Sequence, residues 1–258
     1  MPKLRSAAFY LKNPVYWAHF CRRAIKPFQP DLDTAHWRAE ATRWAQDRAE
    51  PLDTLLAQLG IAPAGAMPPS LDPAVLETAR TRAARSPHKM GGAGHIDLVH
   101  AVTRLKRPQA VIETGVAYGW SSLAFLAAMQ ANRQGRLVSV DRPYPGAGNE
   151  PYVGIAVPDE YRDRWTVIRE PDRNGLYRAV ARFPDGIDIA HYDSDKSYRG
   201  RMFGYAVLWK ALRPGGLFIS DDIQDDMAFA DFVARKDARY GVTPLGGKYV
   251  GMAVKAGA

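Results

Sequence analysis

The sequence contains a single cysteine, Cys21, among its 258 residues. One cysteine cannot form a disulfide within the chain, and it excludes the cysteine-rich ligand sets of structural zinc sites. Long apolar runs are also absent, since no stretch approaches the ~20 residues that a membrane-spanning helix needs. Near the N-terminus, Pro14, His19 and Arg22 interrupt the sequence before the apolar core of a secretory signal can form. We therefore expect a soluble, cytoplasmic protein.

Two phosphate-binding motifs are missing at the most informative stretch of the chain. Between Glu113 and Ser121 the order is E-x-G-x-x-x-G-x-S, which is not the dinucleotide fingerprint G-x-G-x-x-G, and no Gly-Lys-Ser/Thr follows as in a phosphate loop. What is present is an apolar run that ends at Glu113, then Gly115 and Gly119, then a segment compatible with a helix. This pattern predicts a strand, a tight turn and a helix N-terminus whose backbone N–H groups approach a ligand. A Cβ at either glycine would obstruct the turn and the ligand.

A second short apolar strand, residues 137–141, ends at Asp141 about one βα unit later. In α/β proteins that bind nucleosides, an acid at the end of the second strand bonds the ribose hydroxyls. The alternative is an ordinary acidic residue in a loop after a strand.

The chain carries a formal net charge of +8, from 35 basic and 27 acidic residues. Nucleic-acid-binding proteins concentrate Lys and Arg on one face, often among aromatic residues. Here the basic residues are spread along the whole chain, which favours a solvated basic surface. An anionic acceptor or partner is the second interpretation, and the charge distribution argues against nucleic acid.

The order of patterns predicts an α/β fold, a Rossmann-like seven-stranded sheet with helices on both faces. From residue 111 onward strands and helices alternate, which is typical of a parallel sheet. Residues 242–245 and 249–254, joined by Gly246-Gly247, predict a C-terminal antiparallel hairpin. Residues 1–60 look helical, and 33–60 read as an amphipathic helix. We therefore divide the chain into an N-terminal helical extension, 1–72, and a main domain, 73–258, which begins at an Asp72-Pro73 helix start.

Acidic residues end two further predicted strands. Residues 187–192 lead to Asp193, and a Pro-Gly-Gly turn followed by Leu217-Phe218-Ile219 leads to Asp221 and Asp222. Strand ends of a doubly wound sheet open onto one crevice, so these three carboxylates should converge there. Without neutralising partners they would repel one another, and such an all-oxygen cluster usually holds Mg²⁺, or Mn²⁺ or Ca²⁺ in its place. The alternative is that one acid caps a helix and another pairs with an arginine.

Lys196 follows Asp193 by three residues and is the candidate general base. A cation next to a lysine disfavours the charged ammonium, which brings the lysine toward base function at neutral pH. The alternative is a surface lysine at the start of a helix. We interpret His191 as a buried, hydrogen-bonded residue, and His95 and His100 as structural or surface residues because their spacing is not that of metal ligands.

Taken together, these motifs resemble the class I S-adenosylmethionine-dependent methyltransferases, over roughly residues 90–258. The spacing is similar to the metal-dependent O-methyltransferases of the catechol and caffeoyl-CoA type, whose fourth strand ends in an aspartate ligand with a lysine base three residues later. It also resembles the macrocin and mycinamicin sugar O-methyltransferases and the cephalosporin-hydroxylase-like proteins. The fifth strand ends in Asp-Asn in the catechol type, whereas Asp221-Asp222 looks more like the sugar-modifying branch. That branch often has a histidine where Lys196 stands.

The resemblance implies a role for each candidate residue. S-adenosylmethionine would be bound by Glu113, Gly115, Ala117, Gly119 and Ser121 at its amino acid end, by Asp141 at the ribose, and near Asp172 at the adenine. A divalent metal would be bound by Asp193, Asp221 and Asp222, with Asp193 and Lys196 as the catalytic residues. The extension 1–72 would act as a lid, a substrate-binding segment or a dimer arm.

The resulting hypothesis is an enzyme that methylates a hydroxyl of a small polar molecule, such as a sugar or a natural-product intermediate. A methyltransferase that needs no metal, a nucleoside-fold binding protein without transfer activity, and an RNA methyltransferase are the alternatives. No Asn-Pro-Pro-Tyr-like motif or RNA-binding module supports the last. The insertion 146–158 is predicted to be a substrate loop. A homodimer is compatible with the sequence.

Overall fold

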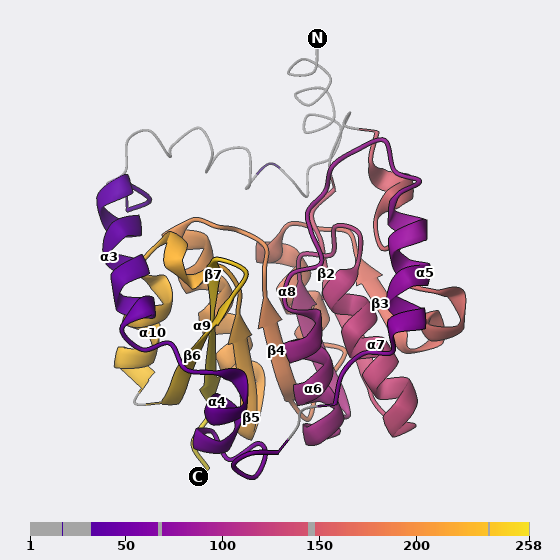
Figure 1. Cartoon of the computed structure of the whole chain (residues 1–258). Helices are drawn as coiled ribbons and strands as arrows, with labels where there is room; N and C mark the ends of the chain where they lie inside the picture. The colour runs from indigo at the N-terminus through magenta and orange to yellow at the C-terminus, as the bar shows by residue number, and fades with distance from the viewer. Residues whose placement is uncertain (1–16, 18–31, 67–68, 144–147, 237, 258) are drawn as a thin grey trace.

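A seven-stranded sheet forms the centre of the computed structural model, which describes residues 17, 32–66, 69–143, 148–236 and 238–257. The strand order is β3-β2-β1-β4-β5-β7-β6 (Figure 1). The strands are β1 (Ala110–Thr114), β2 (Arg136–Val140), β3 (Trp165–Ile168), β4 (Ile187–Tyr192), β5 (Leu212–Ser220), β6 (Arg239–Leu245) and β7 (Lys248–Val254). Strands β1 to β5 pair in parallel, whereas β7 is antiparallel to both β5 and β6. The predicted α/β fold with a C-terminal hairpin is confirmed.

Helices cover both faces of this sheet (Figure 1). They are α3 (Ala35–Gln46), α4 (Leu52–Gln58), α5 (Pro73–Ala83), α6 (Ile96–Lys106), α7 (Trp120–Asn132), α8 (Asp172–Val180), α9 (Tyr198–Ala211) and α10 (Ala228–Lys236). Short 3₁₀ turns are η3 (Glu150–Tyr152), η4 (Asp159–Arg164) and η5 (Ile223–Asp225).

Neighbouring residues of the central strands belong to two different hydrophobic clusters. Val111 and Leu217 pack with helices α4 to α7, whereas Ile112 and Phe218, the next residue of each strand, pack with helices α8 to α10. Successive side chains of a strand point to opposite faces, so an uninterrupted apolar run fits a strand covered on both sides. This burial explains why the strands could be read from the sequence as short apolar runs.

The predicted amphipathic helix over 33–60 is in fact two helices, α3 and α4. Thr34 caps α3 by accepting a hydrogen bond from the N–H of Trp37 at 3.4 Å. The chain then leaves the helix after Gln46 and starts again at Pro51, the N-cap of α4. Proline has no N–H and its ring clashes with the preceding turn, so one continuous helix cannot cross this position. The predicted helical residues before Leu32, apart from Trp17, lie outside the described residues.

The described part of the N-terminal extension packs directly on the C-terminal hairpin. Ala49 forms a bridge with Val242 of β6, and the N–H of Glu50 donates to the Val242 carbonyl at 2.9 Å. Leu55 of α4 is fully buried and lies in the same hydrophobic cluster as Val250 of β7. These contacts attach the described part of the N-terminal extension to the C-terminal hairpin. The division of the chain at residue 72 stays a prediction.

The parallel register brings three strand ends level with one another. Thr114 of β1 pairs with Tyr192 of β4, and Tyr192 pairs with Ser220 of β5. The residues that follow are Gly115, Asp193 and Asp221, so the glycine turn and the acidic strand ends start from one edge of the sheet.

Replacing Leu55 with alanine should destabilise the whole protein by about 2–4 kcal/mol, because the cavity would open inside the core shared by α4 and the sheet. Urea unfolding followed by circular dichroism should show a single transition with a lower midpoint. Gln58→Ala, at an exposed position of the same helix, is the control and should leave the midpoint almost unchanged. An extension that unfolds in a separate, earlier transition would contradict this result.

Candidate functional site

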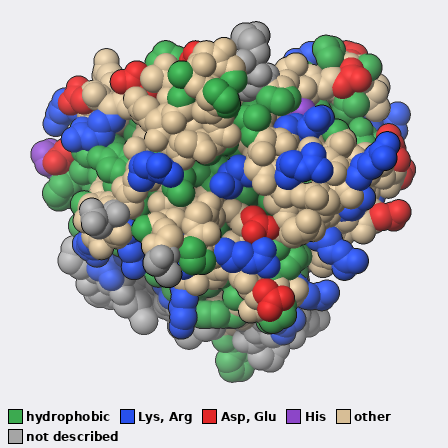
Figure 2. All heavy atoms as spheres, turned by 90° about the horizontal axis from the view of Figure 1, so that it is seen from below, with side chains coloured by type: hydrophobic (Ala, Val, Ile, Leu, Met, Phe, Trp, Pro, Cys, Tyr) green, Lys and Arg blue, Asp and Glu red, His purple; other side chains and the backbone are tan. Residues whose placement is uncertain are grey.

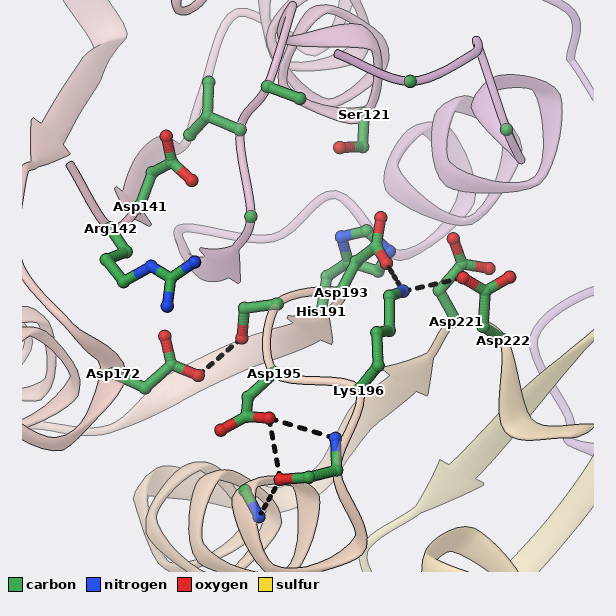
Figure 3. A pocket seen from close by; sticks show the side chains of 18 of the residues that line it. Ser121, Asp141, Arg142, Asp172, His191, Asp193, Asp195, Lys196, Asp221 and Asp222 are labelled. Atoms are coloured by element: carbon green, nitrogen blue, oxygen red, sulfur yellow. Dashed lines mark hydrogen bonds and ion pairs between the residues drawn. The ribbon is translucent and has the colours of Figure 1, made fainter. Parts of the chain in front are cut away.

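A cavity of about 1640 Å³ lies at the carboxyl ends of the parallel strands. Most of the predicted site residues line it, namely Gly115, Ala117, Ser121, Asp141, Asp172, Asp193, Lys196, Asp221 and Asp222. Glu113 and Gly119 do not belong to its lining. One cavity therefore combines the glycine turn, the acid of the second strand and the acidic ends of the fourth and fifth strands (Figure 3).

The glycine turn follows β1 and winds through the left-handed region. Gly115, Ala117 and Gly119 have φ values of 82°, 48° and 88°. A Cβ on Gly115 would collide with the carbonyl oxygen of Asp193, so this glycine lets the turn pack against the end of β4. A Cβ on Gly119 would lie 3.0 Å from the Cα of Gly154. Gly119 thus permits backbone packing outside the cavity, whereas the sequence suggested that it makes room for a ligand.

Residues 148–158, the described part of the segment predicted to be a substrate loop, support the turn from behind. The N–H of Gly154 donates to the Ala117 carbonyl and that of Ala156 to the Tyr118 carbonyl, both at 2.9 Å. None of residues 148–158, which the structure describes, lines the cavity. The described part of this insertion therefore holds the turn in place from outside the cavity.

Glu113 is completely buried behind Ser121. Its carboxylate accepts hydrogen bonds from the hydroxyls of Ser121, Ser122 at 2.6 Å and Ser139 at 2.7 Å. His191 Nδ1 lies 3.7 Å from the same carboxylate. Burial lowers the pKa of His191, but Glu113 outweighs this effect and the net pKa is raised. His191 is buried, as the sequence predicts, but its Nδ1 has no hydrogen-bond partner among the described residues. Glu113 fixes the Ser121 hydroxyl by accepting its hydrogen bond.

Asp141 and Asp172 lie on the same side of the cavity as the glycine turn. Arg169 donates to the Asp141 carboxylate and also pairs with Glu150 at 2.7 Å. Asp172 accepts hydrogen bonds from the Ser194 hydroxyl at 2.5 Å and the Tyr192 hydroxyl at 3.2 Å. Burial raises the pKa of Asp172 to about 6. One carboxylate on this wall is therefore charge-paired, and the other has a raised pKa because it is buried.

Asp193, Asp221 and Asp222 converge as the sequence predicts. Each offers an oxygen within 4.8 Å of the other two. The premise that they lack neutralising partners is wrong, however. Lys196 contacts Asp193 and lies 2.7 Å from Asp222, as Figure 3 shows, and His95 contacts Asp221.

A further cation, Lys248, reaches the same cluster, with its Nζ 2.8 Å from Asp222 Oδ1. Burial disfavours the charged form of Asp222, but Lys196 and Lys248 outweigh it and hold its pKa well below the usual range. Burial also lowers the pKa of Lys196, yet Asp193 and Asp222 raise it by more. In this arrangement the two carboxylates favour the charged ammonium form of Lys196, and its role as a general base stays a prediction.

Sequence reasoning missed the contributions of His95 and Lys248. His95 lies 126 positions before Asp221, and its place after the glycine-rich stretch 91–94 was the only local signal. Lys248 immediately follows the Gly246-Gly247 turn of the predicted hairpin. Neither position marks a site until the sheet brings the hairpin and the start of α6 to the same edge.

Comparisons with known proteins are consistent with this geometry. Residues 112–223 match the family model described as a methyltransferase domain. No curated protein matches the chain.

Solved structures share the fold at low sequence identity. The O-methyltransferase from Bacillus cereus in complex with SAH is 16% identical at a TM-score of 0.54, covering 79% of this chain and 100% of that one. TomG is an O-methyltransferase from Streptomyces achromogenes involved in tomaymycin synthesis and was solved with SAM. It is 18% identical at a TM-score of 0.53, and the match covers 73% of this chain and 92% of TomG. A methyltransferase from Geobacter sulfurreducens is 21% identical at a TM-score of 0.54, and the match covers 73% of this chain and 90% of that protein.

Replacing Asp172 with asparagine should stabilise the protein at neutral and alkaline pH. The folded pKa of about 6 exceeds the ordinary value of 3.8, so the native state favours the protonated carboxyl and loses stability as the pH rises from about 4 to about 6. Asparagine keeps an oxygen that accepts the Ser194 hydroxyl but carries no charge. Urea unfolding should show a gain on the order of 2 kcal/mol at about pH 8 and almost none at about pH 4. A gain of equal size at both pH values would contradict this explanation. Asp163→Asn, at an exposed position, serves as the control.

Proposed function

We propose that the protein is an enzyme that transfers a methyl group from S-adenosylmethionine to a hydroxyl of a small polar molecule with the help of a divalent cation. The match of residues 112–223 to a methyltransferase domain and the order of the strands support this proposal. The observation that carries the proposal is the continuity of one cavity. The glycine turn and Asp141 line one part of it, and Asp193, Lys196 and Asp222 line another. A donor and an acceptor can thus meet inside it.

The residues around the turn fit S-adenosylmethionine. Ala117, a residue with a side chain, is held in the left-handed region on the cavity wall, a strain that is typical of functional sites. Gly119 leaves the N-terminus of α7 without a side-chain cap, so its backbone N–H groups are available to a carboxylate. Ser121 offers a hydroxyl, and Asp141 lies where the ribose hydroxyls are bound in related folds. Asp172 lines the same cavity, where its carboxylate can accept a hydrogen bond from the adenine amino group.

The donor set at the other end fits a hard divalent cation. Asp193, Asp221 and Asp222 supply only carboxylate oxygens, which Mg²⁺ and Mn²⁺ prefer. Lys196 and Lys248 already neutralise part of their charge, so a cation has to share Asp222 with ammonium groups. The site is therefore suited to moderate rather than very tight binding of the cation.

When bound, S-adenosylmethionine supplies an activated methyl group, and the cation lowers the pKa of the acceptor hydroxyl. The chain itself has to align the two reactants and handle one proton. We assign the proton transfer to Lys196, because its Nζ lies between Asp193 and Asp222 on the cavity wall. These carboxylates raise its pKa, so Lys196 accepts a proton only when their charge is offset.

The acceptor is proposed to be a sugar or natural-product intermediate, neutral or anionic. Leu32 and Asp33 line the cavity, so the described end of the N-terminal extension contributes to the acceptor side. Asp33 is fixed there, because it accepts a hydrogen bond from the N–H of Tyr198 at 2.8 Å. On the face of the molecule shown in Figure 2, Lys and Arg side chains are scattered and form no continuous stripe. Along the sequence, too, the basic residues are spread rather than clustered, which favours a small acceptor over nucleic acid.

A methyltransferase that needs no metal is the second candidate. The observation in its favour is that each of the three carboxylates has a basic partner, namely Lys196, His95 or Lys248. A cluster neutralised in this way does not require a metal ion for its stability.

Calorimetric titration should show that the protein binds S-adenosylmethionine with a micromolar dissociation constant. Asp141→Asn should weaken binding about tenfold, since one charged hydrogen-bond acceptor for the ribose is lost. Asp163→Asn, an exposed residue of η4, should bind like the wild type. Absence of binding by the wild type would overturn the methyltransferase proposal.

Binding of Mn²⁺, followed by the loss of its free EPR signal, tests the metal. The wild type should bind it, Asp193→Asn should bind at least about tenfold more weakly, and EDTA should reverse the effect. Lys248→Met should bind about two- to fivefold more tightly, because a competing ammonium is removed. Lys248→Arg keeps the charge and should behave like the wild type. A wild type that binds S-adenosylmethionine but no Mn²⁺ would favour the metal-independent candidate.

A further inference from the structure

Arg201 is a buried arginine that the proposed chemistry leaves without a role. It lies on α9, its side chain is 1% exposed, and it does not line the cavity. Burying a guanidinium is costly unless each part of it is paired. Here Nη1 donates to the carbonyl of Asp221 and Nη2 to the carbonyl of Asp222, both at 2.9 Å. On its other edge, Nε lies 3.2 Å from Asp226 Oδ2.

The two carbonyls belong to an unusual corner of the chain. Successive side chains of a strand point to opposite faces of the sheet, so an extended continuation of β5 would separate the carboxylates of Asp221 and Asp222. Both nevertheless line the cavity. The reason is that Asp222 adopts the left-handed conformation, with φ 51° and ψ 41°. Aspartate tolerates the left-handed region better than most residues with a side chain, but contacts from the surroundings are needed to keep it in this one conformation.

Arg201 supplies such an enforcing contact. A guanidinium is planar and presents parallel N–H groups, so it can bind two neighbouring carbonyls at once, whereas a lysine ammonium is a point charge on a flexible stem. Arg201 also belongs to the segment after β4 that carries Asp193 and Lys196. Its two hydrogen bonds therefore connect one half of the acidic cluster to the other.

We propose that Arg201 is a positioning residue for the divalent-cation site, whose guanidinium holds the Asp221–Asp222 corner so that both carboxylates face Asp193. The inference rests on the cation binding proposed above. It adds a residue outside the cavity that sets the geometry of the ligands without touching substrate, cofactor or metal.

The test compares Arg201→Lys with the wild type. Lysine keeps a positive charge opposite Asp226 but cannot bridge the carbonyls of Asp221 and Asp222. We expect Mn²⁺ to bind at least about tenfold more weakly, the effect typical of groups that orient metal ligands. The dissociation constant for S-adenosylmethionine, measured by calorimetry on the same samples, should change less than about twofold, because the glycine turn lies on another strand.

Two control variants separate positioning from stability. Asp226→Asn removes the closer of the two ion pairs of Arg201, leaving Asp225 at 3.7 Å and the hydrogen bonds to both carbonyls, so it should bind Mn²⁺ within about threefold of the wild type. Leu55→Ala loses stability in the core of α4, on a helix that does not line the cavity, and should also keep its Mn²⁺ affinity.

A milder variant decides the question if Arg201→Lys does not fold. The Tyr205 hydroxyl lies 3.3 Å from Arg201 Nη1 and 2.5 Å from Ser220 Oγ. Tyr205→Phe removes this support for the guanidinium and should weaken Mn²⁺ binding about two- to fivefold.

Several outcomes would overturn the inference. If the folded Arg201→Lys protein binds Mn²⁺ like the wild type, or if Leu55→Ala loses as much affinity as Arg201→Lys, then Arg201 has only a structural role. An unchanged affinity in Tyr205→Phe, where Arg201→Lys fails to fold, has the same meaning. If the wild type binds S-adenosylmethionine but no Mn²⁺, the metal-dependent part of the proposed function fails together with this inference.

Discussion

The parallel pairing of β1, β4 and β5 is the constraint on which the rest of the site depends. Because Thr114, Tyr192 and Ser220 are level in the sheet, the chain leaves all three strands at one edge. Gly115 can then pack on the carbonyl of Asp193 only because it has no Cβ. A slip of one residue would turn every side chain of one of these strands to the opposite face, where it would meet different neighbours and pack poorly. The hydrophobic core thus fixes where the polar residues of the site meet.

The second constraint on this site is that the negative charges of its three clustered carboxylates have to be compensated. Three carboxylates within 4.8 Å would repel one another strongly in a partly buried cavity. Three basic residues lie around this cluster. They are Lys196 before α9, Lys248 at the start of β7 and the buried Arg201 within α9. The two lysines pair with carboxylates of the cluster, whereas Arg201 binds the backbone carbonyls of Asp221 and Asp222 and forms its ion pairs with Asp225 and Asp226. The three carboxylates therefore stay close together, because basic partners compensate much of their charge.

The sequence predicted the acidic residues of the site better than their partners. Asp141, Asp193, Asp221 and Asp222 end strands, and the end of a parallel strand is a local feature that apolar runs reveal. His95 and Lys248 belong to a loop and a hairpin, and nothing in their neighbours marks them as basic partners of Asp221 and Asp222. The same limit explains the error over residues 33–60, where periodicity was correct but Pro51 divides the helix. It also explains why the segment after residue 146 was interpreted as a substrate loop, although residues 148–158 pack behind the glycine turn.

By itself the sequence determined the alternation of strands and helices, the glycine turn after β1 and the acids at the strand ends, because each of these depends on residues close together in the chain. Only the tertiary structure decided that Glu113 lies behind Ser121, that Lys196 is paired on two sides, and that Arg201 reaches the corner after β5. These contacts join residues far apart in sequence, or depend on a left-handed turn at Asp222 that its residue type does not predict. Their geometry follows from the packing of helices on a shared sheet, which no local pattern encodes.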